Sequence, residues 1–331
     1  MKTDRILYYP YINIPDSLWT CRALLYWESI GVIVPEAYIY HPENLNPYMR
    51  DLVSAQLVEQ IIPNKFRNDL PNFKKGFYEI IFSPPFFINP RRKAFQKGNI
   101  FKIHIEKFDN GLMDFLKEIG LAREDQYPWW QVETITAKLL MTYLATALSI
   151  ADNRQPLTDI IESNRYLNLR KNKMIDNRMV LRNRLLNDIL PLPAKIQVRD
   201  LETIKNKYSE ELSRFRNKIE KTILDINQFT HQENFEDKYK LELEELKDSK
   251  KFIVEKLSAP KFGKIVFGTL CSLSATGIAI AQTPKEQLSW TIPSVLSAAY
   301  QAFESNKQEN FRKEPMSYLA LIEKQLKLEN K

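Results

Sequence analysis

The chain contains 331 residues with a mass of 39.0 kDa, a length that indicates two domains of roughly 150 residues each. Hydrophobic residues make up 44% of the chain and charged residues 27%, which excludes a disordered protein and supplies a substantial core. With 8 glycines, 2 cysteines and a net charge of +7, the composition argues against the glycine-rich nucleotide-binding folds and excludes a disulfide framework.

The N-terminal residues do not resemble a signal peptide. Asp4 and Arg5 interrupt the apolar stretch, and Pro10 and Pro15 break any helix that an export signal would need. We therefore expect the protein in the cytoplasm.

The first 125 residues alternate between strand and helix patterns. Their opening β-α-β-α-β order predicts right-handed crossovers between parallel strands. The predicted strands lie at 6–14, 32–34, 61–62, 77–82 and 100–105, and the predicted helices at 18–30, 47–60 and 112–119, the last one closed by Gly120.

From Trp129 onward the pattern is almost entirely helical. A long apolar helix is expected at 132–150, and Pro191 and Pro193 mark a linker. Apolar residues then recur at three- and four-residue steps, which predicts an antiparallel amphipathic hairpin at 200–258. The predicted fold class is α+β: an N-terminal α/β portion with a small mixed sheet at 1–125, followed by a predominantly helical portion at 126–331.

Several segments of this chain occur together, in the same order, in a known protein family. They include LYYPYINIPDSLW at 7–19, ALLYWESIGVIVPE at 23–36, PLTD at 156–159, LPLPAKIQV at 190–198 and ELSRFRNKI at 211–219. With these segments the chain resembles an uncharacterised bacterial family, a domain of unknown function, over nearly its whole length. The resemblance implies no established activity, cofactor or catalytic residue. It does imply a role in conflict or defence, because members of that family occur among accessory genes.

The motifs of common enzyme classes are absent from the sequence. There is no GxGxxG, no GxxxxGK[ST] and no GxSxG, so the usual phosphate cradles and the nucleophile elbow are missing. His41, His104 and His231 are dispersed, without an HExxH motif or a Cys/His pair at ligand spacing, so we expect no metal and no cofactor. His104 is expected to be an ordinary sheet residue.

A carboxylate site would leave no recognisable spacing, so an enzyme of that kind stays open as a third reading. Asp69, Glu79 and Glu106 lie on or near neighbouring predicted strands. However, the lysine that restriction-type nucleases place two residues after the acid is missing at Glu79.

A short basic stretch at 164–187 carries most of the net charge. It holds seven basic residues and one acid, Asp176, for a local charge of +6 that leaves about +1 for the remainder. The basic residues are Arg165, Arg170, Lys171, Lys173, Arg178, Arg182 and Arg184.

On a helix, Lys171, Arg178 and Arg182 fall within about 40° of each other, between two apolar stripes. This ridge is the candidate anion-binding site, for nucleic acid, a lipid headgroup or an acidic protein surface. The competing reading is a solvated face neutralised by acids elsewhere, such as Glu242, Glu244 and Glu245.

A second candidate is an apolar hairpin at 263–304. Residues 265–284 carry no formal charge and are long enough to cross a bilayer, and an uncharged stretch at 287–303 follows. Its small residues repeat at four-residue spacing and would form either a membrane face or a packing face: Gly268, Ser272 and Thr276, and Cys271, Ala275 and Ala279.

Two main hypotheses follow from these features. The first is a non-enzymatic bacterial interaction protein that uses a basic helix to engage an anionic partner. The alternative is a membrane-active effector, associated with the inner membrane through the apolar hairpin, in antiviral defence. A protein partner or a homo-oligomer is compatible with both.

Overall fold

The computed structural model describes residues 4–83, 86–160, 173–190, 192, 196–228, 234–258 and 313–329. The chain divides into two compact units, unit 1 with residues 1–176 and 194–202, and unit 2 with residues 177–193 and 203–331. This division differs from the predicted boundary near residue 125. Helix α7 (Thr134–Ala151) packs against strand β1 (Arg5–Tyr8), and strand β7 (Gln155–Leu157) pairs with β1. Both elements therefore belong to unit 1 although they follow residue 125.

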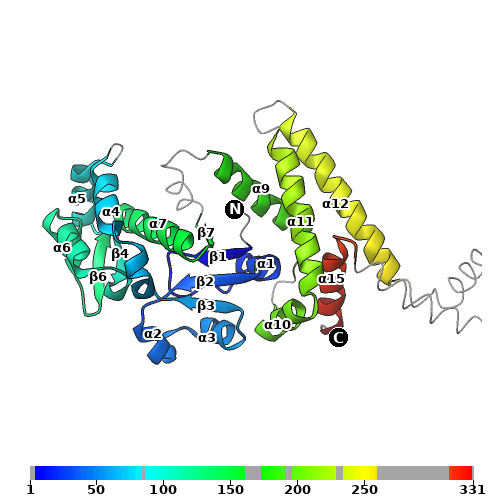
Figure 1. Ribbon diagram of the computed structural model, residues 1–331, viewed down its shortest axis with the longest axis horizontal. Coiled ribbons are helices and arrows are strands. Elements are labelled where there is room, and N and C mark those ends of the chain that lie inside the picture. Colours follow the sequence, from blue (N-terminus) through cyan, green and yellow to red (C-terminus); the bar gives the residue numbers. More distant parts are fainter. Residues whose placement is uncertain are drawn as a thin grey trace, which may run out of the picture. The chain divides into compact units, whose positions relative to one another are not determined.

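The α+β fold class is confirmed, and unit 1 contains two separate sheets. Sheet A is wholly parallel, with the order β3-β2-β1-β7, and Leu7 of β1 lies opposite Gly31 and Pro156 of its neighbours (Figure 1). Its elements are β1, α1 (Leu18–Tyr26), β2 (Ser29–Ile33), α2 (Ala37–Tyr40), the 3-10 helix η1 (Pro42–Asn44), α3 (Pro47–Ser54), β3 (Val58–Ile61) and β7.

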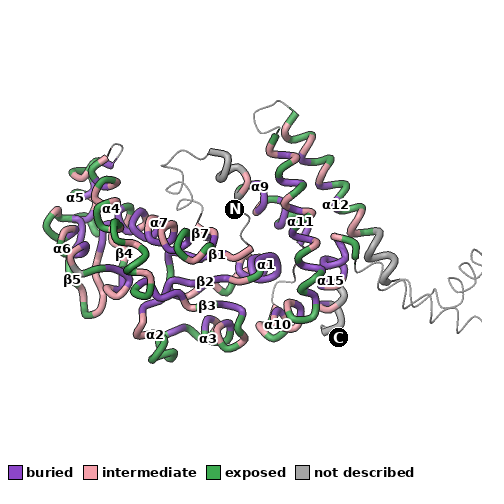
Figure 2. Tube along the Cα trace, viewed as in Figure 1, coloured by how far each residue is buried: buried purple, intermediate pink, exposed green. Residues whose placement is uncertain are grey.

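The predicted β-α-β-α-β order is confirmed with different bounds: β1, α1 and α3 are shorter than predicted, whereas β2 and β3 begin earlier and are longer. Strand β1 ends at Tyr8, before Pro10, which has no N–H to contribute to a ladder. Helix α3 ends at Ser54, and the left-handed Gln56 (φ 56°) turns the chain into β3. Most side chains of β1 and β2 are buried, as expected for a parallel sheet covered on both faces (Figure 2).

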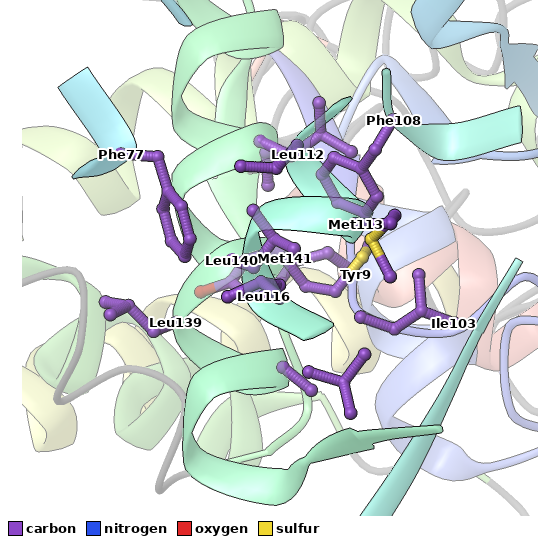
Figure 3. Packing of buried hydrophobic residues seen from close by; sticks show 14 of the residues in the cluster. Tyr9, Phe77, Ile103, Phe108, Leu112, Met113, Leu116, Leu139, Leu140 and Met141 are labelled. Carbon is purple, nitrogen blue, oxygen red and sulfur yellow. The ribbon is translucent and has the colours of Figure 1, made fainter. Parts of the chain in front are cut away.

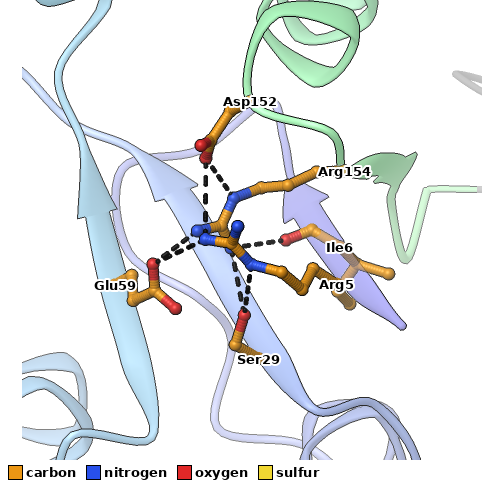
Figure 4. A network of polar contacts seen from close by, with 6 residues as sticks. All are labelled: Arg5, Ile6, Ser29, Glu59, Asp152 and Arg154. Carbon is orange, nitrogen blue, oxygen red and sulfur yellow. Dashed lines mark hydrogen bonds and ion pairs between the residues drawn. The ribbon is translucent and has the colours of Figure 1, made fainter. Parts of the chain in front are cut away.

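A polar network ties three of these strands together (Figure 4). The fully buried side chain of Arg154, just before β7, forms ion pairs with Asp152 and with Glu59 of β3. It also donates to the hydroxyl of Ser29 on β2 at 3.2 Å and to the Ile6 carbonyl of β1 at 3.4 Å. Gly31 leaves room for this guanidinium, because a Cβ there would lie 3.0 Å from its Nη1.

Sheet B is antiparallel with the order β4-β6-β5, and helices pack around it. The predicted strand at 77–82 is wrong, since these residues belong to helix α4. Phe77 and Ile81, four residues apart, are buried on one side of α4, while Lys74, Lys75 and Glu79 are exposed. The elements of this part are the 3-10 helix η2 (Pro63–Asp69), α4 (Phe73–Phe82), α5 (Ile88–Gln96), β4 (Ile100–His104), the 3-10 helix η3 (Ile105–Lys107), α6 (Asn110–Glu118), β5 (Ala122–Glu124) and β6 (Trp129–Glu133).

The core of unit 1 forms where α7 meets α4, α6 and sheet B. Figure 3 shows Leu140 and Met141 of α7 among Phe77, Met113 and Ile103, all of them buried. Within the described ranges, α7 is the one helix long and apolar enough to cross a membrane, with a mean hydropathy of 1.4. It is also 56% buried inside the molecule, as the central helix of a soluble core would be.

Unit 2 is built from helices. The first helix of the amphipathic hairpin predicted at 200–258 is divided at Tyr208: α10 (Val198–Lys207) ends before this residue and α11 (Ser209–Asn227) begins after it. Helix α12 (Phe235–Ser258) lies beside α11 and runs antiparallel to it (Figure 1), joined by an ion pair between Lys218 and Glu245 at 3.0 Å. Unit 2 also holds α9 (Lys173–Ile189) from Asn177 on, and α15 (Ser317–Glu329), whose Tyr318 packs on Phe215 of α11.

Candidate functional site

The basic residues predicted to bind anions fall on and before helix α9. Arg165, Arg170 and Lys171 lie outside the described residues, and Lys173 is the first residue of α9. The structure therefore places the side chains of Arg178, Arg182 and Arg184.

Arg182 lies in the packed face of α9. The residue is 7% exposed, and its guanidinium donates to both carboxylate oxygens of Glu220 on α11, at 2.6 and 2.9 Å. Leu181, Leu185 and Leu186 are buried around it. An arginine flanked by apolar residues on both sides occupies the middle of the buried face, so it needs an internal counter-ion. The expectation that Arg182 faces an external anion is thus corrected.

Arg184 is also engaged within unit 2. Its two Nη atoms donate to the two carboxylate oxygens of Glu236, both at 2.8 Å, and its guanidinium lies 3.9 Å from the ring centroid of Tyr239. The hydrogen bonds with Glu236 raise the pKa of Arg184 and lower the pKa of Glu236. Glu220 and Glu236 thus pair with Arg182 and Arg184 of α9, whereas Glu242 and Glu245 form ion pairs with Lys238 and Lys218.

Arg178 is partly exposed, one turn before Arg182. Its Nε is buried and has no hydrogen-bond partner among the described residues.

The carboxyl ends of parallel strands are the usual ligand-binding edge of such a sheet, at the place where the strand order reverses. In sheet A this place lies between β1 and β7, and the chain's own side chains occupy it. The hydroxyl of Tyr8 donates to Oδ1 of Asp159 at 3.0 Å, and the Trp19 ring lies 5.5 Å from the Tyr8 ring. Burial raises the pKa of Tyr8 well above its ordinary value.

Lys107 is buried close to the same edge, although no motif in the sequence marks it as a buried residue. Its Nζ donates to the carbonyl of Pro10 at 3.3 Å, and it is 5% exposed. Burial lowers the pKa of Lys107 to about 7. The residue is enclosed by protein, so its present position suits a structural role.

The three carboxylates considered for an enzyme site have separate surroundings. Glu106 accepts the Ala37 N–H at 2.9 Å, Asp69 ends η2, and Glu79 is exposed on α4 rather than on a strand. No group of three or more His, Cys, Asp or Glu side chains suited to a metal ion occurs in the part of the chain that the structure describes. His104 is the buried last residue of β4, as predicted, with its ring edge-on to Tyr38 and Trp129.

A second basic segment lies at 65–107. It contains ten basic residues and three acids, so the remainder of the chain outside the two basic segments is net acidic. No Asp or Glu occurs between Glu79 and Glu106. This acid-free interval was visible in the sequence, and it includes the whole of α5.

Helix α5 presents a basic outer face. Arg92 and Lys93 are exposed on the helix, and Lys97 is exposed at its C-terminal end. Arg91 and Phe95 are buried on the inner side, where the Arg91 guanidinium lies 3.9 Å from the centroid of the Phe86 ring. Arg92 Nε donates to the Ile119 carbonyl at 2.5 Å, which fixes that side chain. We call Arg92, Lys93 and Lys97 the basic face of α5.

Comparisons of the chain with protein-family profiles, curated proteins and solved structures find no match in any of the three.

Proposed function

We propose that the protein is an interaction protein that binds an anionic, phosphate-bearing partner through the basic face of α5. The observation that carries this proposal is the acid-free interval between Glu79 and Glu106, which leaves α5 with exposed cations and no carboxylate of its own. Uncompensated positive charge on a surface attracts polyanions and accelerates their association.

The contrast with α9 supports this choice of helix. Two of the basic residues of α9, Arg182 and Arg184, already hold bidentate carboxylate partners. Binding an external anion there would require these pairs to separate. On α5, by contrast, an anion would meet Lys93 and Lys97 without displacing a carboxylate of the same helix.

The test is a binding titration with two probes, a fluorescein-labelled DNA duplex and vesicles that contain phosphatidylglycerol. The variant Lys93→Glu/Lys97→Glu reverses two exposed charges and leaves Arg92 on the Ile119 carbonyl. The matched control, Lys240→Glu/Lys247→Glu, makes the same charge change at exposed positions of α12.

We expect the native chain to bind at least one probe, with affinity that falls as salt rises. The α5 variant should lose about tenfold or more in affinity, and the α12 control much less. Binding of neither probe, or equal losses in the two variants, would overturn the proposal.

A further inference from the structure

Two exposed phenylalanines lie at the end of α4 and just before α5. Phe82, the last residue of α4, is 58% exposed, and Phe87, immediately before α5, is 67% exposed. Between them, the Phe86 N–H donates to the Ser83 carbonyl at 2.8 Å. We call Phe82 and Phe87 the aromatic tip.

A neighbouring ring holds Phe82 of the aromatic tip in place. The Phe82 ring meets Phe115 of α6 edge-on, with centroids 5.8 Å apart, and Phe115 also packs on Tyr78. Next to Phe87, the buried Phe86 lies under Arg91. The exposure of the tip therefore belongs to a packed structure, in which the neighbours Phe86 and Ile81 point inward and Phe82 and Phe87 do not.

From this arrangement we infer that the aromatic tip and the basic face of α5 dock on an anionic lipid bilayer, with Phe82 and Phe87 inserted at the interface and the basic face on the headgroup phosphates. This inference rests on the proposed function and names its partner. Protein segments at a bilayer surface combine apolar side chains, which enter the headgroup and acyl boundary, with Lys and Arg beside them. The acid-free interval places both components within residues 80–105.

A bilayer fits this surface better than a nucleic acid does. Single-stranded nucleic acids bind along grooves in which bases stack on the open faces of aromatic rings. Here the aromatic residues stand at the end of one helix and the start of the next, and Phe82 already packs against Phe115. An apolar side chain can enter a bilayer from such a position without a stacking partner, which makes a lipid surface the more consistent occupant.

The test compares vesicles of phosphatidylcholine alone with vesicles that also contain phosphatidylglycerol, in a sedimentation assay on the full chain. The variant is Phe82→Ser/Phe87→Ser, with Phe87→Ser alone as a second variant that leaves the Phe82–Phe115 contact in place. The control is Val180→Ser/Leu241→Ser, at two positions with matching exposure, 62% and 61%. A urea unfolding curve checks that each variant is folded.

We expect the native chain to bind the anionic vesicles and not the neutral ones. The tip double variant should bind them about tenfold or more weakly, Phe87→Ser should fall between it and the native chain, and the control should bind like the native chain. Binding to the DNA duplex should be the same for the tip variant and the native chain.

Three outcomes would overturn the inference. In the first, vesicle binding is lost in Lys93→Glu/Lys97→Glu but unchanged in the tip variants. Binding would then depend on the basic face of α5 alone, so the proposed function would stand and the insertion of Phe82 and Phe87 would not. An equal loss of duplex binding in the tip variants would assign the phenylalanines to nucleic acid. Absence of binding to every probe would remove the proposed function and the inference together.

Discussion

At the scale of single residues, burial rather than a charged partner sets the state of Lys107. Its amine meets the Pro10 carbonyl, and burial alone lowers its pKa from 10.5 to about 7. In the unfolded chain the amine is solvated and keeps its proton up to about pH 10.5. Between these two values the unfolded state binds more protons than the folded state, so the stability contributed at this position rises with pH.

This linkage predicts the behaviour of Lys107→Met. The variant has no titrating group at this position, so native stability should rise relative to it by about 1.4 kcal/mol per pH unit between pH 7.5 and 9.5. The unpaired Pro10 carbonyl adds a cost of about 1–3 kcal/mol that does not change with pH. Urea unfolding curves at several pH values measure the difference. A difference that is flat across this window would contradict the depressed pKa.

At the scale of secondary-structure elements, α9 shows how a charged residue can hold two helices together. Arg182 joins α9 to α11 through two hydrogen bonds to Glu220, inside a face formed by buried leucines. A buried pair of this kind contributes less than its contact distances imply, because both ions lose water, but removal of one partner leaves an uncompensated charge.

We therefore expect Arg182→Met to destabilise the protein by about 2–3 kcal/mol. This cost is small for the loss of one partner of a buried ion pair, because the side chain of Glu220 is 20% exposed and water can still reach its carboxylate. The double variant Arg182→Met/Glu220→Met should be destabilised by clearly less than the two single variants summed. Chemical denaturation of the four proteins gives the coupling energy. Strict additivity would mean that the two side chains do not interact in solution.

The same elements show what could be predicted from sequence. The parallel crossovers, the helix at 110–118 with a left-handed Gly120 after it (φ 72°) and the hairpin of α11 and α12 follow from local patterns of apolar residues and turn formers. The helical α4 was mistaken for a strand because IIF at its end is rich in strand formers, whereas packing of Phe77 and Ile81 decides its structure. In sheet B the sequence predicts strand β4 but not β5 and β6, and in sheet A it does not predict β7; these three strands are only three to five residues long.

The candidate site was only partly accessible to the same reasoning. The angular positions of Arg178 and Arg182 were predictable, but which face of α9 is buried depends on α11. The acid-free interval around α5 could be read directly from the sequence. The exposure of Phe82 and Phe87 could not, because Phe86 and Phe87 are chemically identical neighbours that only the fold distinguishes.

At the scale of the whole molecule, unit 1 is closed by its last strand. Strand β7 pairs with β1 across about 150 residues of sequence, and α7 packs against β1, β4 and β6. A fragment that ends at residue 125 lacks both elements, so we expect it to show no cooperative urea transition. A fragment with residues 1–176 should unfold cooperatively. Circular dichroism during denaturation measures both, and a sharp transition in the shorter fragment would contradict this division.

The position of β7 also has a consequence for biosynthesis. While a ribosome is making this protein, β1, β2 and β3 emerge early and can align, yet the outer edge of β1 has no neighbour until residues 155–157 leave the exit tunnel. Arg154 arrives together with that strand, and it reaches Ser29 and Glu59 as soon as the strand is in place. The nascent chain thus carries an open strand edge through nearly half of its translation, and a single short segment ends that exposure.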